Sequence, residues 1–357
     1  MMHKRPLFRF IVKSLLAAAP VLAVAALYLW RDPFGVVHPY ERAFTVVDGV
    51  AVNKNAGFVA VESFKRHNAR LHYNAFILGS SMSQYYRAQW WQRHLPPQAS
   101  VCHLDASMET VEGLLNKMRY VNSHGARIEH ALIVMEEEML HREPSTTRLL
   151  WLQHPATTPQ HDWLDFHNAF FNAFKQWPYF KFAIAPHRYA HELEQRGMMT
   201  GDIPARIEDI NESYYPVLDS LIEHHPEQFF TPSKLAGMRH TELPQPIRPA
   251  IEGKRLRQLL ALRALLERNR TSFIIIVPPR YHRPTLHPVD LAMLRQIFGV
   301  ENVHDFSRDS ALNDNPRLYY DQPAHLIASR CKQLLDSAYC EKTFIKAIKL
   351  GNFANKR

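Results

Sequence analysis

Residues 14–30 form an uncharged apolar stretch close to the amino terminus, and this stretch limits how the whole chain can be organised. Residues 10–12 extend it once the Lys13 side chain reaches toward a membrane interface. About twenty apolar residues at a rise of ~1.5 Å each match the ~30 Å hydrocarbon core of a bilayer. We therefore expect residues 1–32 to form a short cytoplasmic tip followed by one transmembrane helix.

Charge on either side of this stretch predicts its orientation. Lys4, Arg5, Arg9 and Lys13 precede it without any acid, and the neutral pair Arg31-Asp32 follows it. The positive-inside rule then places the amino terminus in the cytoplasm and residues from about 33 onward outside.

Two other interpretations of the stretch stay open. It is a cleaved signal peptide if Ala23-Val24-Ala25 is a processing site, or it is a buried core helix. The apolar run continues beyond Ala25 through Leu27 to Trp30, and no polar stripe divides its faces. Both observations favour a retained anchor.

Composition excludes several classes of protein. The net charge is +9 over 357 residues, and four of the cations lie in the first thirteen residues, so the remainder is only +5. Without a run of Lys or Arg, this excess does not predict a nucleic-acid partner. With 46% hydrophobic residues the chain is typical of a globular protein, and we expect neither a metal nor another cofactor. Cys331 and Cys340 either form a disulfide or are two buried thiols.

Short apolar strands alternate with helices over much of the chain. Strands are expected at 72–78, 101–104, 131–135, 272–277 and 302–306, and helices at 80–91, 108–123, 253–269, 288–298 and 324–335. This order predicts an α/β fold with a mostly parallel sheet between two helical layers, in one periplasmic domain of residues 33–357. Residues 141–250, rich in aromatic residues, His and Pro, are expected to be a helical insertion with a helix near 163–181.

Two short segments carry side chains suited to nucleophilic catalysis. Gly79-Ser80-Ser81 ends a predicted strand and leads into a helix, whose first backbone N–H groups are free to stabilise an oxyanion. Asp321 and His325 lie in one short segment before the last helix, where an acid can orient the imidazole that deprotonates a serine. Both segments also fit ordinary helix caps.

In these segments the chain resembles the SGNH (GDSL-like) hydrolase superfamily. It is most similar to the membrane-anchored bacterial branch that works in cell-surface polysaccharide O-acetylation and teichoic-acid D-alanylation. The likeness rests on the anchor, Ile77-Leu78-Gly79-Ser80-Ser81, the strand from Phe273 to Val277 with Pro278-Pro279, and the late Asp321 and His325. It covers roughly residues 70–140 and 253–336 by order and spacing.

The resemblance implies a role for each matching residue. Ser81 is then the nucleophile with Ser80 as the substitute, His325 is the base, and Asp321 is its orienting acid. The family usually has two residues between the acid and the base, whereas this chain has three, so Asp305, Asp309 and Asp314 remain alternative acids.

The family's glycine and asparagine oxyanion donors have no clean counterpart here. Ser107 lies where the glycine is expected, and residues 136–138, three glutamates, lie near the asparagine position. The glutamates either bind a cationic substrate group or cap the strand end. Arg280, His282 and Arg283 follow the strand at 272–277 and are expected to line the mouth of the site, where they can meet an anionic polymer.

We therefore expect a serine-dependent acyl esterase or O-acyltransferase acting on a cell-surface glycan or polymer. A singly anchored enzyme of this kind needs a multi-spanning membrane protein that delivers the acyl group, a partner that is implied by the resemblance alone. The alternative is a non-catalytic scaffold or glycan-binding subunit of a cell-envelope polysaccharide complex.

Overall fold

The structure is a computed structural model that describes residues 4–38, 46–158, 162–195, 199–200, 203–238, 248–281, 285–320 and 325–354. The chain divides into two compact units. Unit 1 comprises Met1–Lys54 and His161–Ile203, and unit 2 comprises Asn55–Gln160 and Pro204–Arg357. Part of the expected insertion at 141–250 thus groups with the amino-terminal segment.

Unit 2 is an α/β unit with a parallel sheet, as expected. Within the described residues, five strands lie in the order β10-β9-β5-β3-β4, and every neighbouring pair is parallel. Their bounds are β3 (Ala75–Gly79), β4 (Val101–His103), β5 (His130–Val134), β9 (Ser272–Val277) and β10 (Val303–Asp305). Numbered along the chain this is the order 2-1-3-4-5, in which the direction of strand addition changes between β3 and β5.

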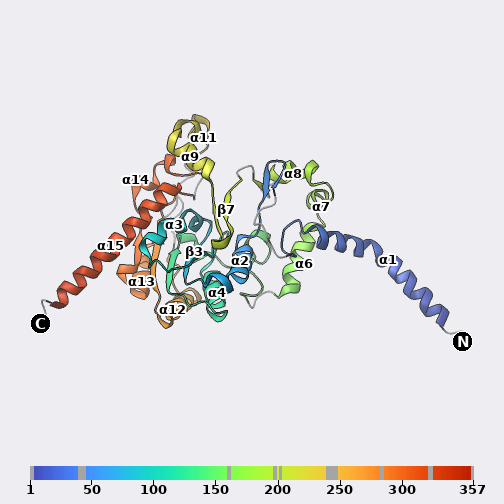
Figure 1. Ribbon diagram of the computed structural model, residues 1–357, viewed down its shortest axis with the longest axis horizontal. Coiled ribbons are helices and arrows are strands. Elements are labelled where there is room, and N and C mark those ends of the chain that lie inside the picture. The colour runs from blue at the N-terminus through green and yellow to red at the C-terminus, as the bar shows by residue number, and fades with distance from the viewer. Residues whose placement is uncertain are drawn as a thin grey trace. The chain divides into compact units, whose positions relative to one another are not determined.

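Along the chain, helices of unit 2 lie before, between and after these strands (Figure 1). The α-helices are α2 (Ala56–Leu71), α3 (Ala88–Trp91), α4 (Val111–Ser123), α5 (Glu137–His141), α9 (Pro216–His224), α10 (Pro226–Phe229), α11 (Pro232–Gly237), α12 (Gly253–Arg268), α13 (Pro288–Phe298), α14 (Ser310–Asn313) and α15 (Ala328–Ala354). Short 3-10 helices are η1 (Ser81–Tyr85), η2 (Gln92–His94), η3 (Leu149–Trp151), η4 (Glu208–Ile210), η5 (Val300–Asn302) and η6 (Pro316–Leu318), and β7 (Ala205–Ile207) pairs with β8 (Glu212–Tyr214).

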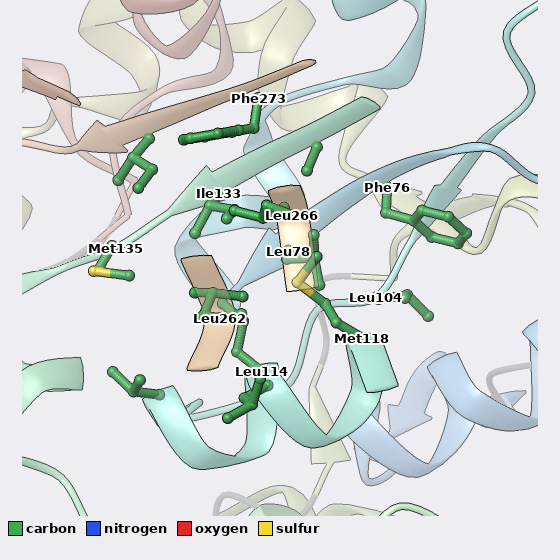
Figure 2. Packing of buried hydrophobic residues seen from close by; sticks show 14 of the residues in the cluster. Phe76, Leu78, Leu104, Leu114, Met118, Ile133, Met135, Leu262, Leu266 and Phe273 are labelled. Carbon is green, nitrogen blue, oxygen red and sulfur yellow. The ribbon is translucent and has the colours of Figure 1, made fainter. Parts of the chain in front are cut away.

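Alternate residues of each central strand enter two different hydrophobic clusters. Phe76 and Leu78 of β3 belong to the cluster that contains Met118 of α4 and residues of α12, as Figure 2 shows. Ile77 belongs to the second cluster with Leu335 of α15. Each of these five side chains is fully buried, and burying one large apolar side chain contributes about 1.5–3 kcal/mol. The strands are therefore buried on both faces, which explains their continuous apolar sequence.

Unit 1 contains the amino-terminal apolar helix and a small helical cluster. Its elements are α1 (Lys4–Arg31), β1 (Val46–Val47), β2 (Val50–Val52), α6 (Trp163–Phe174), α7 (Trp177–Ile184), α8 (Pro186–Gln195) and β6 (Met199–Thr200). Within α1, Phe8–Arg31 is a 24-residue segment of mean hydropathy 2.2, and its most apolar part is unburied. By length and composition, the segment is long and apolar enough to cross a membrane. One such helix is by itself weak evidence of a crossing.

Several expected element boundaries were wrong, each for a local reason. The helix expected at 163–181 is interrupted between α6 and α7, because Pro178 has no N–H to donate into the preceding turn. The helix expected at 80–91 is instead η1 followed by α3. Ser83 donates its backbone N–H to the Ser80 carbonyl three residues back, which tightens the first turn. The last helix continues from Leu335 to Ala354, with no proline to end it.

Candidate active site

The candidate site lies at the carboxyl ends of β3 and β5, where the strand order changes direction. Open parallel sheets bind ligands outside the carboxyl ends of their strands at such a point, because the flanking connections leave on opposite sides. Gly79 ends β3 and is followed by Ser80 and Ser81, while Glu136 follows β5. The Ser80 hydroxyl donates to the Glu136 carboxylate at 2.5 Å and joins the two strand ends.

Gly79 makes the close approach of β3 to β5 possible. Its φ is +151°, and a Cβ at this position would lie 2.5 Å from the Val134 carbonyl oxygen and 3.0 Å from the Ser83 Cβ. No side chain fits there without moving backbone. The glycine therefore sets the path of the chain into Ser80 and Ser81.

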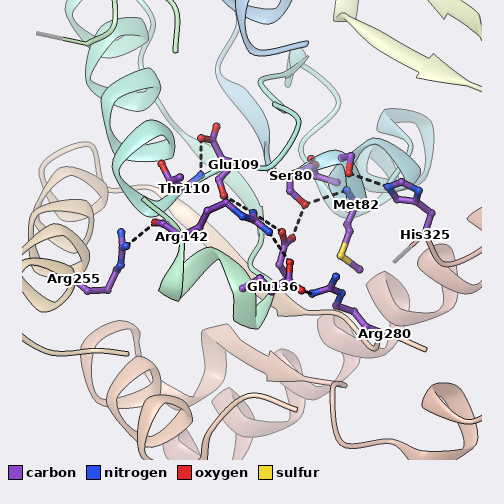
Figure 3. Close-up of polar contacts among 12 residues, drawn as sticks. Ser80, Met82, Glu109, Thr110, Glu136, Arg142, Arg255, Arg280 and His325 are labelled. Atoms are coloured by element: carbon purple, nitrogen blue, oxygen red, sulfur yellow. Dashed lines mark hydrogen bonds and ion pairs between the residues drawn. The ribbon is translucent and has the colours of Figure 1, made fainter. Parts of the chain in front are cut away.

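The two neighbouring serines have different surroundings. Ser80 is 2% exposed, and its hydroxyl both donates to Glu136 and accepts from the Met82 N–H at 3.3 Å as the cap of η1. Ser81 is only partly buried, and its Oγ lies 2.9 Å from Nε2 of His325. Ser80 thus has a structural role, whereas the Ser81 hydroxyl is paired with an imidazole (Figure 3).

The segment that carries His325 is held by backbone and aromatic contacts. The Tyr320 N–H donates to the His325 carbonyl at 2.8 Å, and Tyr319 forms an isolated antiparallel bridge with Leu326. The Tyr85 ring lies 5.2 Å from the imidazole between centroids. These contacts bring residues 244 positions apart to hydrogen-bonding distance.

Four aspartates were candidates for the acid that orients the imidazole. Asp321, the expected partner, lies outside the described residues. Of the alternatives, Asp305 accepts from the backbone N–H and hydroxyl of Ser307, and Asp309 caps α14 through the Ala311 N–H. Both carboxylates are thus engaged in local structure.

Each of the three consecutive glutamates has a partner within the chain, and two of these partners are arginines. Arg142 donates to Glu136 at 3.2 Å and to Glu138 at 2.8 Å, and Arg280 pairs with Glu138 at 2.8 Å. Glu137 lies 2.9 Å from His141 instead. Burial, reinforced by the neighbouring Glu138 charge, raises the pKa of Glu137 to about 7. Since Arg142 and Arg280 hold two of the carboxylates, this geometry favours a role in fixing the strand end over one in binding a cationic substrate.

The backbone N–H groups considered as oxyanion donors are those at the start of η1 and in the loop after β4. At the start of η1, the Met82 N–H is donated to the Ser80 hydroxyl and the Ser83 N–H to the Ser80 carbonyl. The Ala106 N–H is already donated to the Gly79 carbonyl at 3.1 Å. Ser107, the expected donor, is partly buried and lines a small cavity with Gly57 and Thr110.

The expected substrate-binding cations are only partly described. Arg280 is 8% exposed and its guanidinium pairs with Glu138, so it stabilises the glutamate cluster. His282 and Arg283 lie outside the described residues. Because Arg280 is buried and paired with Glu138, the structure does not favour a direct contact between this residue and a polymer.

A groove whose lining includes neither Ser81 nor His325 was missed by the sequence reasoning. It has a volume of about 470 Å³ and is lined by Trp90, Asp219, Glu223, Tyr320 and Gln333, among others. Tyr320 links the groove to the pair, since its ring stacks on Tyr85 at 5.0 Å and its hydroxyl donates to Asp219. Burial raises the pKa of Asp219. Asp219 and Glu223 gave no sequence signal, because α9 comes from the irregular region of the chain.

Comparison of this chain with protein-family models and with curated proteins found no match.

Proposed function

We propose that this chain is an SGNH-type serine esterase or O-acyltransferase that forms an acyl-enzyme on Ser81. The observation that carries the proposal is the 2.9 Å contact between Ser81 Oγ and His325 Nε2, next to the switch point of the sheet. A parallel sheet buried on both faces is compatible with the three-layer α/β/α architecture of that superfamily. The serine turn after β3 and the histidine before α15 follow its order of motifs.

In each half of the proposed reaction, His325 accepts one proton and then donates it. In the tautomer that leaves Nε2 unprotonated, His325 accepts the Ser81 proton as Oγ attacks the carbonyl carbon of an ester-linked acyl group. The tetrahedral intermediate breaks the bond to the alcohol, which takes the proton from His325, and the acyl group stays on Ser81. Water then gives hydrolysis, whereas a glycan hydroxyl gives transfer, and either regenerates the serine.

The groove lined by Trp90 and Asp219 supports a glycan as the substrate. Its volume of about 470 Å³ falls within the ~300–1,000 Å³ range of small-molecule sites. An indole and a phenol ring offer flat apolar faces, and Asp219, Glu223 and Gln333 offer hydrogen bonds to hydroxyl groups. This mixture suits a sugar better than a long acyl chain.

We further propose that α1 crosses the bacterial inner membrane with its amino terminus in the cytoplasm. Support comes from its length, its mean hydropathy of 2.2 and the four cations near its amino-terminal end. The rest of the chain is then periplasmic, and a multi-spanning membrane protein supplies the acyl group. That partner follows from the family resemblance.

The direct test is labelling of the full chain in detergent with a fluorophosphonate, which reacts with activated serines. We expect an adduct that peptide mapping locates on Ser81 and that Ser81→Ala abolishes. Ser80→Ala is the matched control and should retain the label, because Ser80 faces Glu136. No adduct on folded wild-type chain, or an adduct on another serine, would contradict the proposal.

One observation favours a second candidate, a non-catalytic scaffold or glycan-binding subunit. The position after β5 holds a carboxylate, Glu136, where an oxyanion would need a hydrogen-bond donor. If the folded chain binds glycan and stays unlabelled, this second function is supported.

A further inference from the structure

Helix α7 in unit 1 has an apolar outer face that the described residues do not cover. Trp177 and Ile184 are seven residues apart and therefore lie on one side of the helix, two turns from each other. They are 66% and 58% exposed, and Phe180 between them is partly exposed. We call Trp177, Phe180 and Ile184 the outer face of α7.

The opposite side of α7 is also apolar, and it is buried. Phe182 packs in a cluster with Val47 and Val50 of the β1-β2 hairpin and with Leu193 of α8. A helix at a water-exposed surface normally turns polar side chains outward. An outer face that carries a tryptophan and an isoleucine therefore indicates an apolar environment on that side.

Contacts fix α7 to the end of the apolar helix α1. The Arg31 Nε donates to the Ala183 carbonyl at 2.6 Å, and the Phe34 ring lies 5.2 Å from the ring of Tyr179. Ala183 directly precedes Ile184. The last residue of the 24-residue apolar segment is thus bonded to the residue next to the outer face of α7.

Helix α6 adds to this attachment. The Tyr28 ring of α1 lies 5.4 Å from Phe171 and 5.3 Å from Phe174, and Tyr28 is 3% exposed although Trp30 is 73% exposed. One side of the last turns of α1 is therefore packed against α6, while Trp30 on another side is exposed.

The charge of this region matches a phospholipid surface. Residues 166–191 contain no Asp or Glu but carry Lys175, Lys181 and Arg188. Lys181 pairs with Glu192 of α8 at 3.0 Å, so Lys175 and Arg188 are the cations that carry this argument. Lys175 and Arg188 are exposed. Tyr and Trp concentrate at membrane interfaces, and Lys and Arg beside them are attracted to anionic headgroups.

We propose that the outer face of α7 is embedded in the headgroup region of the same bilayer that α1 crosses. The helix then lies in the interface as a second membrane contact, which fixes unit 1 at the membrane surface. Continuity with the end of α1 and the acid-free, cationic sequence favour lipid over a second protein as the occupant. The proposal rests on the proposed membrane crossing of α1, and it is independent of the chemistry at Ser81.

The test is collision of a nitroxide label with molecular oxygen, which enters bilayers, and with a water-soluble nickel chelate. The full chain carries Cys340→Ser, which removes the exposed thiol, plus Ile184→Cys for labelling, in vesicles of phosphatidylcholine and phosphatidylglycerol. Val21→Cys, at a 65% exposed site inside α1, is the bilayer reference. Val289→Cys, at a 52% exposed apolar site on α13 in unit 2, is the matched water reference.

We expect the ratio of oxygen to nickel collisions at Ile184 to be several-fold higher than at Val289 and to approach that at Val21. A ratio at Ile184 equal to that at Val289, with Val21 in the bilayer, overturns the proposal and leaves the membrane crossing intact. Low collision rates with both reagents at Ile184 also overturn it, because protein then covers the outer face. A water-exposed Val21 refutes the crossing and the proposal together.

Discussion

Replacing Gly79 by alanine is expected to disturb both the sheet and the candidate site. The new Cβ lies 2.5 Å from the Val134 carbonyl oxygen, so β3 and β5 must separate, and alanine must also adopt the φ of +151°. A positive φ costs an L residue ~1–2 kcal/mol, and overpacking costs ~1–3 kcal/mol. We expect a loss of about 3 kcal/mol, which lowers Tm by roughly 6–12 °C in a unit of this size.

Gly125→Ala is the matched control for this variant. Gly125 also has a positive φ, +89°, but a Cβ there meets no atom within 4 Å. Its loss should be about 1 kcal/mol, the cost of the backbone conformation alone. Thermal melting of both full-length variants in detergent, followed by fluorophosphonate labelling, gives the comparison. Equal melting temperatures, with unchanged labelling in Gly79→Ala, would refute the argument that this glycine positions Ser81.

Three further predictions concern other parts of unit 2. Glu137→Gln should raise Tm at pH 8 and leave it nearly unchanged at pH 5. Because the pKa of Glu137 is raised to about 7, the folded chain favours the protonated carboxyl and loses stability as the pH rises from 4.5 through 7. An equal gain in Tm for Glu137→Gln at pH 5 and pH 8 would contradict this reasoning. Arg142→Met leaves the buried Glu136 carboxylate without its arginine and should lower the free energy of unfolding, measured with urea, by about 3–5 kcal/mol. Arg142→Lys should restore only part of this loss. An unchanged urea midpoint in Arg142→Met would argue against the pairing. Cys340 is exposed and should react with a maleimide in the folded chain. Cys331 is 2% exposed, and burial raises its pKa, so it should react only after unfolding. Peptide mass mapping of the labelled chain checks this, and equal labelling of both cysteines in the folded chain would contradict it.

The sheet was largely predictable because its strands are apolar on both faces. Runs such as Phe273 to Val277 have no polar alternation, which predicts strands covered on two sides, and the structure places them in a parallel sheet. The long apolar helix α1 was also predictable, because residues 14–30 are uncharged and apolar. Strand boundaries shifted by a few residues where caps intervened, as at His72, which ends α2 with a φ of +47° instead of beginning β3.

Other features depend on contacts that local sequence does not encode. The pairing of Arg142 with Glu136 and Glu138 requires the fold of α5, and the groove at Asp219 requires α9 to reach the start of α15. The grouping of residues 161–203 with the amino-terminal segment likewise depends on long-range packing. Spacing did bring Ser81 and His325 forward as candidates, because each follows a strand or precedes a helix in a position typical of such residues.

The central claim is that His325 activates Ser81, and the fluorophosphonate labelling rate of His325→Ala tests it most directly. A positioned general base contributes about 10²–10⁴-fold to such a reaction. The account predicts that Ser81 in the folded variant is labelled at least about 100-fold more slowly than in the wild-type chain. An unchanged rate would contradict it, because the 2.9 Å contact would then carry no activation.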